Sequence, residues 1–153
     1  MTHLESLEIS FIETLELPRD AAKWLLDTWN VIQVLDDVAD GDEVTTDDCY
    51  RATNACLVGM PSNPFYMRHQ QWLLPALSQM VLKWMASDLA ERAGRADMRS
   101  YMWRAGYYDV VMLATSLVHG PSSEKALLAL SLYGETADEY SKEFGIGQGS
   151  EKC

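Results

Sequence analysis

The sequence predicts an all-α protein, a single compact bundle of five to seven helices with no sheet. Three observations lead to this prediction. Apolar residues recur at intervals of three and four along most of the chain, which is typical of helices that bury one face. Capping residues and glycine or proline stops separate these segments, and no segment alternates apolar with polar residues as a strand does. With 153 residues, 48% of them hydrophobic, the chain fits one domain over 1–153.

The N-terminal part of the chain predicts two helices. Segment 1–17 is ambiguous, but its apolar spacing favours a short amphipathic helix over a strand; the residues are Leu4, Leu7, Phe11 and Leu15. Pro18 suits the first position of a second helix, where its missing N–H costs nothing. That helix should run to Asp40 and end at Gly41, since glycine is preferred just past a helix C-terminus.

Two further helices are predicted in the middle of the chain. Thr45 and Thr46, followed by two aspartates, have the pattern of an N-cap with acidic residues in the first turn, so a helix should extend to about Val58 and end at Gly59. Asn63-Pro64 combines a cap with a proline at the first helical position. The helix that it begins should continue to about Gly94, bent at Pro75, which removes one backbone hydrogen bond.

The C-terminal part predicts three more segments. A strongly apolar helix should span 96–119 and stop at Gly120-Pro121. Ser122 or Ser123 caps a shorter helix that reaches about Tyr133. A last helix over 135–144 follows Gly134, and the glycine- and serine-rich residues 145–153 should form a flexible tail.

Charge and composition restrict the classes of partner and location. The formal net charge is −11, from 23 acidic and 12 basic residues, so the chain should repel nucleic acid and anionic membranes. No apolar run approaches the roughly 18 residues of a membrane span, and the acidic N-terminus lacks the pattern of a signal peptide. Three cysteines fit a reducing compartment. We therefore expect a protein that is neither secreted nor transmembrane.

Three aspartates near the end of the 18–40 helix interrupt its apolar pattern. At about 100° per residue, one face of this helix is apolar; it carries Ala21, Leu25, Trp29, Ile32, Leu35 and Ala39. Asp36 falls inside this face, and Asp37 and Asp40 lie on the neighbouring stripe. Three carboxylates therefore occur within about one helical turn, with at least one directed at the core.

Asp109 repeats this anomaly in the 96–119 helix. It lies one turn before an almost wholly apolar stretch, and an unpaired buried carboxylate costs several kcal/mol, so it needs a partner. Candidate partners are a bound cation or the side chains of Arg68, Arg104, His69, His119, Tyr107 and Tyr108. Three interpretations stay open: a buried polar network, a carboxylate cluster that binds Mg²⁺ with a diphosphate, or solvated helix ends.

The segment Asp36-Asp37-Val38-Ala39-Asp40 resembles the DDxxD motif of class I isoprenoid and terpene synthases. The resemblance covers about a dozen residues. It implies an all-helical fold in which Asp36, Asp37 and Asp40 bind Mg²⁺ that holds a substrate diphosphate. Asp109 is the candidate for the opposing acidic residue, and Arg68 or Arg104 would contact phosphate.

A broader resemblance is to small helical proteins encoded by tailed bacteriophages. The segments that carry it include residues 29–37, 40–42, 63–66 and 133–135, together with Tyr140 and Lys142-Glu143. This resemblance implies a phage origin, with the protein in the virion or in the host cytoplasm. It implies no catalytic role. We expect no cofactor, apart from Mg²⁺ if the acidic cluster is functional.

Two functional hypotheses follow. The first is a phage-encoded accessory protein that acts by binding another protein, either a virion or assembly component or a host factor. The second is a Mg²⁺-dependent binder, or enzyme, of a diphosphate-containing molecule. Either is compatible with a homo-oligomer in which the apolar 96–119 helix packs across a twofold axis.

Overall fold

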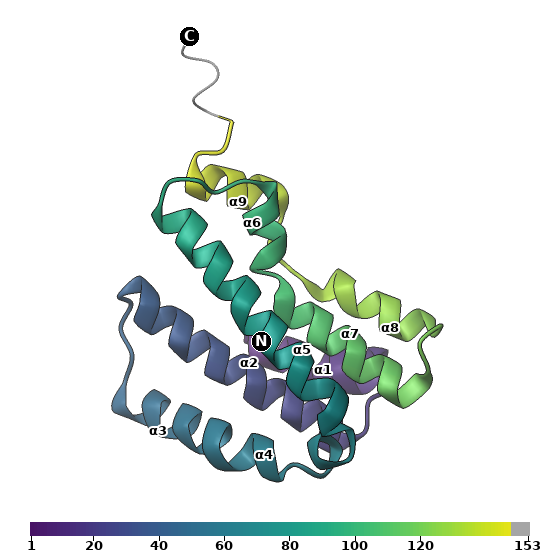
Figure 1. Ribbon diagram of the computed structural model, residues 1–153. Coiled ribbons are helices and arrows are strands. Elements are labelled where there is room, and N and C mark those ends of the chain that lie inside the picture. Colours follow the sequence, from purple (N-terminus) through teal and green to yellow (C-terminus); the bar gives the residue numbers. More distant parts are fainter. Residues whose placement is uncertain (148–153) are drawn as a thin grey trace.

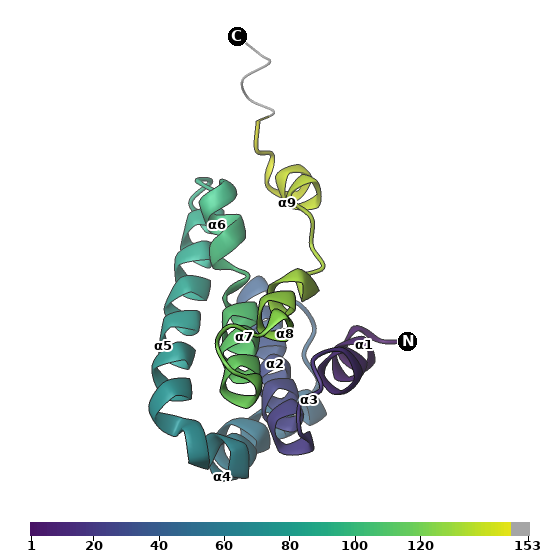
Figure 2. The ribbon, with the colours of Figure 1, turned by 90° about the vertical axis from the view of Figure 1, so that its right-hand side faces the viewer.

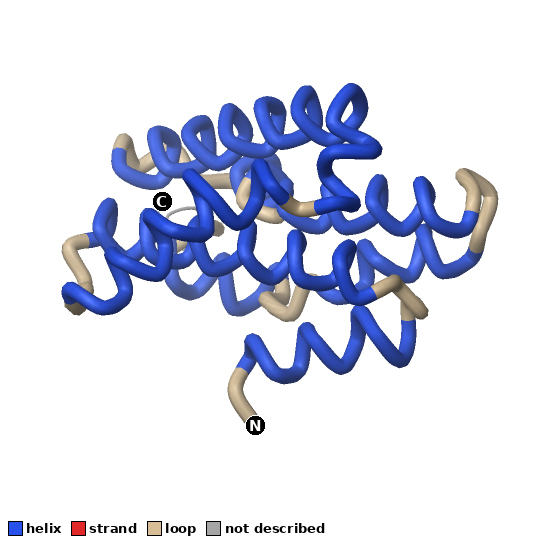
Figure 3. The backbone as a smooth tube through the Cα atoms, turned by 90° about the horizontal axis from the view of Figure 1, so that it is seen from below, coloured by secondary structure: helices blue, strands red, loops and turns tan. Residues whose placement is uncertain are grey.

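The computed structural model describes residues 1–147, and this part of the chain contains helices and connecting loops but no strand (Figure 3). The all-α prediction is therefore confirmed. Six α-helices in this part have seven or more residues: α1 (His3–Ile9), α2 (Arg19–Asp40), α3 (Thr46–Asn54), α5 (Pro64–Arg92), α7 (Gly106–His119) and α9 (Ala137–Phe144). None of the helices in residues 1–147 has the length and apolar character needed to cross a membrane.

Shorter helical segments complete the chain. They are the π-helices η1 (Ser10–Thr14) and η2 (Ala55–Gly59), the short helices α4 (Met60–Ser62), α6 (Met98–Trp103) and α8 (Glu124–Leu128), and the 3₁₀ helix η3 (Ala129–Leu132). Of the predicted tail 145–153, residues 148–153 lie outside the described residues. Of its first residues, Gly145 ends α9 in the left-handed conformation that favours glycine.

The helices surround one hydrophobic core. Figure 2 shows α5 on one side of the molecule and α1 on the opposite side, with α2 and α7 between them. Helices α6 and α9 pack together at one end, beyond the body of the bundle (Figure 1). The largest fully buried side chains come from η1, α2, α5, α7 and α9, among them Phe11, Trp24, Phe65, Val111 and Tyr140.

The N-terminal segment is helical and belongs to the core. The side chain of Thr2 accepts a hydrogen bond from the Glu5 amide and begins α1. The chain continues through the π-helical turn η1, where Phe11 is fully buried, and Leu15 is also fully buried just beyond it. Of the two alternatives for residues 1–17, the amphipathic helix is the correct one.

Several helix boundaries lie where the capping residues predict them. Gly41 ends α2 with φ 76°, a left-handed conformation that costs glycine little. Thr45 caps α3 through a capping box with Asp48. The Asn63 side chain accepts hydrogen bonds from the amides of Phe65 and Tyr66, which begins α5 at Pro64.

The predicted end at Gly59 is wrong, because helical backbone continues through η2 and α4 to Ser62. Gly59 has helical angles, φ −61° and ψ −49°. A Cβ atom at this position would lie 3.1 Å from a carboxylate oxygen of Asp27 on α2. The glycine therefore permits close approach of two helices, so its presence does not mark a helix end.

Two other sequence predictions need correction. The backbone of α5 departs from helical angles at His69 (φ −119°, ψ 16°), upstream of the predicted bend at Pro75. The predicted helix 96–119 is two helices, α6 and α7, separated at Arg104-Ala105. Gly106, at the start of α7, lies against α5, where a Cβ atom would make an ordinary van der Waals contact of 3.5 Å with the Met80 Cα. The buried face of α7 packs within the chain, against α5, α8 and η3.

Candidate binding cavity

The largest cavity lies between the C-terminal halves of α2 and α5 and is closed at one end by the α6–α7 junction and residues 133–144. Its volume is about 610 Å³, within the range of about 300 to 1,000 Å³ common for ligand sites. We call it the acidic cavity, because seven carboxylates line it: Asp36, Asp40, Asp42, Asp88, Glu91, Glu135 and Glu143. Two arginines, Arg92 and Arg104, also line it, and six aromatic residues complete the wall: Trp29, Trp84, Tyr107, Tyr108, Tyr133 and Phe144.

The packing of α2 explains why a cavity forms here. Buried residues of α2 stop at Thr28, and in the remainder of the helix no residue is fully buried. The opposite wall is one face of α5, where Trp84, Ser87, Asp88 and Glu91 recur at helical spacing. The two helices thus leave between them a space that polar side chains line.

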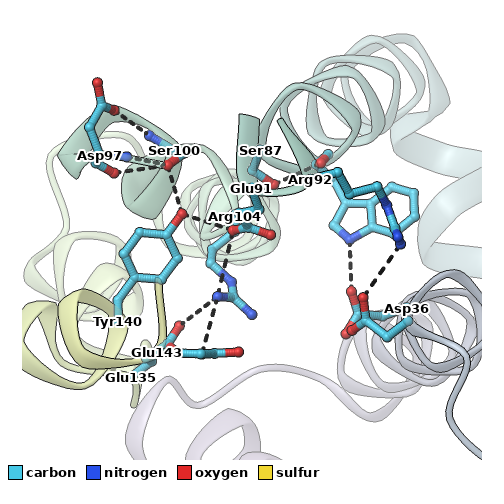
Figure 4. A network of polar contacts seen from close by, with 12 residues as sticks. Asp36, Ser87, Glu91, Arg92, Asp97, Ser100, Arg104, Glu135, Tyr140 and Glu143 are labelled. Atoms are coloured by element: carbon cyan, nitrogen blue, oxygen red, sulfur yellow. Dashed lines mark hydrogen bonds and ion pairs between the residues drawn. The ribbon is translucent and has the colours of Figure 1, made fainter. Parts of the chain in front are cut away.

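Arg104 holds the end of the acidic cavity together (Figure 4). Its Nη1 atom lies close to carboxylate oxygens of three glutamates: Glu91 (3.7 Å), Glu135 (3.6 Å) and Glu143 (3.8 Å). Its guanidinium carbon also lies 5.2 Å from the ring centre of Tyr140 and 5.6 Å from that of Phe144. Charge pairing and cation–π attraction therefore act on the same group.

Tyr140 joins α9 to this cluster. Its hydroxyl donates a hydrogen bond of 2.8 Å to Glu91, and the Ser100 hydroxyl oxygen lies 2.6 Å from it. Both Tyr140 and Ser100 are fully buried, and burial raises the pKa of Tyr140 to about 12. The hydroxyl is therefore a stable donor at neutral pH and fixes α9 against α5 and α6.

Arg92 joins the ends of α2 and α5 at the other side of the cavity. Its Nε atom donates a hydrogen bond of 2.8 Å to Asp88, and Nη2 lies 3.6 Å from Asp40. The same guanidinium donates to the main-chain carbonyl of Ala39. Half of the Arg92 side chain stays exposed, so these charges remain in contact with solvent.

Asp36 lies on α2 one turn before Asp40, and Figure 4 shows it beside Arg92. One of its carboxylate oxygens accepts a hydrogen bond of 3.2 Å from the indole N–H of Trp84 (Figure 4). Within residues 1–147, neither Asp36 nor Asp42 forms an ion pair with a basic side chain. These two carboxylates therefore contribute negative charge that the protein itself does not pair.

Acidic groups outnumber basic groups in the acidic cavity, since seven carboxylates and two guanidinium groups line it. Burial raises the pKa of Asp40, and the neighbouring charge of Asp36 raises it further. Burial likewise raises the pKa values of Glu91 and Glu143, against the opposing effect of Arg104. A cation that entered the cavity would relieve this repulsion.

Comparison with known proteins identifies no relative in which such a cavity could be recognised. No protein family, curated protein or solved structure matches this chain. The chemistry of the acidic cavity is therefore inferred from the residues that line it.

The residues predicted to bind metal or phosphate do not all lie together in the structure. Asp36, Asp40 and Arg104 line the acidic cavity, and Asp37 lies beside it, accepting a hydrogen bond of 3.1 Å from Gln33. The remaining two residues, Asp109 and Arg68, do not line the acidic cavity.

Asp109 is exposed rather than buried, and its carboxylate lies 2.6 Å from Lys83 Nζ, outside the acidic cavity. It therefore does not face Asp36. Arg68, near the start of α5, pairs with Asp20 at 3.0 Å. Both residues form ion pairs near the surface, where such pairs contribute little to stability.

The residues that face Asp36 and Asp40 across the cavity come instead from α5 and from the end of the chain. Asp88 and Glu91 are three residues apart, which places them on one helical face and could have signalled a paired acidic motif. Glu135 and Glu143 carry no such signal, because only the tertiary position of α9 brings them to Arg104.

Arg92 pairs with two of the carboxylates that line the cavity. Among residues 1–147, no three histidine, cysteine, aspartate or glutamate side chains form a group arranged to hold one. The Arg92 guanidinium already lies between Asp40 and Asp88, the carboxylates that a bridging ion would need. Mg²⁺ ligation here would require Arg92 to leave both partners.

Proposed function

We propose that this protein is a phage-encoded accessory protein that binds a partner protein, and that the acidic cavity receives a basic side chain of that partner. The observation that carries the proposal is the combination of excess carboxylates with aromatic walls in one cavity. The resemblance to tailed-phage proteins supports the origin and gives two classes of partner, virion proteins and host factors.

The surroundings of Arg104 support arginine as the preferred guest. Three glutamates and two aromatic rings surround this guanidinium within the protein's own structure. Similar chemistry is present a short distance away, where Asp36 and Asp42 are unpaired and Trp29 and Trp84 form the wall. A planar guanidinium can stack on such rings while it pairs with a carboxylate, which an ammonium group does less well.

A blocked tripeptide with a central arginine tests the proposal directly. We expect it to shift the NMR signal of the Trp84 indole N–H saturably at millimolar concentration, because this group donates to Asp36. Asp36→Asn should weaken binding about fivefold, since an exposed charge pair is worth up to about 1 kcal/mol. Asp37→Asn is the matched control, an adjacent aspartate outside the cavity, and should leave the affinity unchanged.

Two results would contradict the proposal. One is a tripeptide with glutamate in the central position that shifts the Trp84 signal as strongly as the arginine peptide. The other is an equal loss of affinity in Asp36→Asn and Asp37→Asn, which would indicate a general effect of net charge without a specific site. A lysine peptide that binds more weakly than the arginine peptide supports recognition of the planar group.

A second proposal is binding of a Mg²⁺–diphosphate ligand. The observation that favours it is that Asp36 and Asp40 share a cavity with Asp88 and Glu91 of the opposite helix. It predicts that Mg²⁺ and pyrophosphate together raise the melting temperature more than either alone, and that Asp36→Asn abolishes the increase. No change with both at millimolar concentration would reject this proposal and leave the first intact.

A further inference from the structure

A second, smaller cavity adjoins the acidic one. Its volume is about 80 Å³, far below the roughly 300 Å³ at which small-molecule sites begin. We call it the apolar slot, because aliphatic and aromatic side chains dominate its wall: Ile32, Leu35, Met80, Val81, Trp84, Arg104, Gly106 and Tyr107. Four of these residues also line the acidic cavity: Ile32, Trp84, Arg104 and Tyr107. The two spaces are therefore neighbours in one groove.

Large apolar side chains stand exposed at the rim of the slot. Leu35 of α2 is 53% exposed and Val81 of α5 is 46% exposed, although both also line it. On α5, Met85 lies one turn beyond Val81 and is 47% exposed. Exposed apolar groups beside a concave apolar site are a common feature of surfaces that bind another protein.

Apolar and acidic residues are neighbours on both walls of the groove. On α2 the slot residue Leu35 directly precedes Asp36 of the acidic cavity, and on α5 the wall changes within two turns, from Val81 of the slot to Asp88 of the cavity. One turn of helix advances about 5.4 Å. An apolar side chain in the slot and a basic one in the cavity would therefore lie one or two turns apart on a helical partner.

The walls are also fixed relative to one another at two points. The Trp84 indole N–H of α5 donates a hydrogen bond of 3.2 Å to Asp36 of α2. Arg92 holds the far ends of α2 and α5 together through Asp40 and Ala39. A groove whose walls are already held in place loses little conformational freedom when a partner enters.

We infer that this groove binds an amphipathic basic helix of the partner protein, with an apolar side chain in the slot and an arginine in the acidic cavity. The inference rests on the proposed function and names its partner class. Charge complementarity decides the occupant: the groove is acidic, and a second copy of this chain would bring another −11 of net charge to it. Helix-in-groove binding uses the same spacing of side chains.

A labelled helical peptide with leucine and arginine four residues apart on one face tests the inference. We expect Leu35→Ser to weaken its binding about fivefold, because the slot loses an apolar wall. Val38→Ser is the matched control: Val38 is 58% exposed on the same helix and lines neither cavity. It should change the affinity less than twofold. Circular dichroism measures the helical content of each variant, which should be unchanged.

A companion peptide with serine in place of leucine separates the two proposals. We expect it to bind about fivefold more weakly than the leucine peptide and to be insensitive to Leu35→Ser. If Asp36→Asn weakens both peptides while Leu35→Ser weakens neither, the role of the slot is wrong and the proposed function stands. If replacing arginine by glutamate in the peptide leaves binding unchanged, both proposals fail.

Discussion

Replacing Arg104 with methionine is expected to lower the free energy of unfolding by about 2–3 kcal/mol at neutral pH. The aliphatic stem survives in this variant, but Glu91, Glu135 and Glu143 lose the cation that they share. Removing one partner of a partly buried charge cluster leaves the others uncompensated, and this costs more than the pair is worth. Chemical denaturation measures the effect, and limited proteolysis should show earlier cleavage near α9.

The pH dependence of this loss separates electrostatic repulsion from lost packing. Burial raises the pKa values of Glu91 and Glu143 above the ordinary 4.5, so the folded state binds protons more readily than the unfolded chain. The stability that this gives is fully present below pH 4.5 and is lost as pH rises through the folded-state value. Without Arg104 the effect grows, so the deficit should be smallest near pH 4.5 and largest at neutral pH.

Arg99→Met is the control for this experiment. Arg99 pairs with Asp97 at 2.8 Å, but its side chain is 78% exposed, and exposed pairs of this kind contribute little to stability. We expect a small loss that does not vary as steeply with pH. If Arg104→Met lowers the free energy of unfolding equally at pH 4.5 and pH 7, repulsion among the glutamates is not the cause of the loss.

The second large effect is expected at Phe11. Phe11→Ala should lower the free energy of unfolding by about 3–5 kcal/mol, the range for removing a buried phenylalanine ring. Phe11 is fully buried although it lies within the N-terminal segment, in the π-helical turn η1. The loss would show that residues 1–17 are part of the cooperative core, and urea denaturation followed by tryptophan fluorescence measures it.

Ile12→Ala provides the comparison for Phe11→Ala. Ile12 is the next residue in the same turn and is 40% exposed. Because most of the cost of truncation comes from buried surface and the cavity left behind, we expect less than about 1 kcal/mol here. Equal losses at the two positions would mean that the segment as a whole is disrupted and that the ring of Phe11 has no special role.

Local rules account for most of the fold. Capping side chains such as Thr45 and Asn63, and left-handed Gly41, act within one or two turns, so the sequence alone places them correctly. The errors arise where tertiary packing overrides these rules. Gly59 resembles a stop signal, but its missing side chain serves the close approach of Asp27, which no local pattern reveals.

The site was predictable only in part. The acidic turn containing Asp36 and Asp40 does line a cavity, and its departure from the apolar pattern was the signal. Asp109 gave a similar signal, but it lies in the first turn of α7, where its exposed side chain pairs with Lys83 of α5. Sequence periodicity cannot show which tertiary neighbour such a residue meets, so it could not separate the two aspartates.

The arrangement around Arg104 has a consequence for how this protein can evolve. One guanidinium offsets glutamates from α5, the loop after η3 and α9, so inheritance of these positions is coupled. Among homologues that lack the arginine, we expect fewer acids at the three glutamate positions, because the remaining carboxylates would repel one another. Descent should therefore preserve positions 91, 104, 135 and 143 as a set, or replace them together.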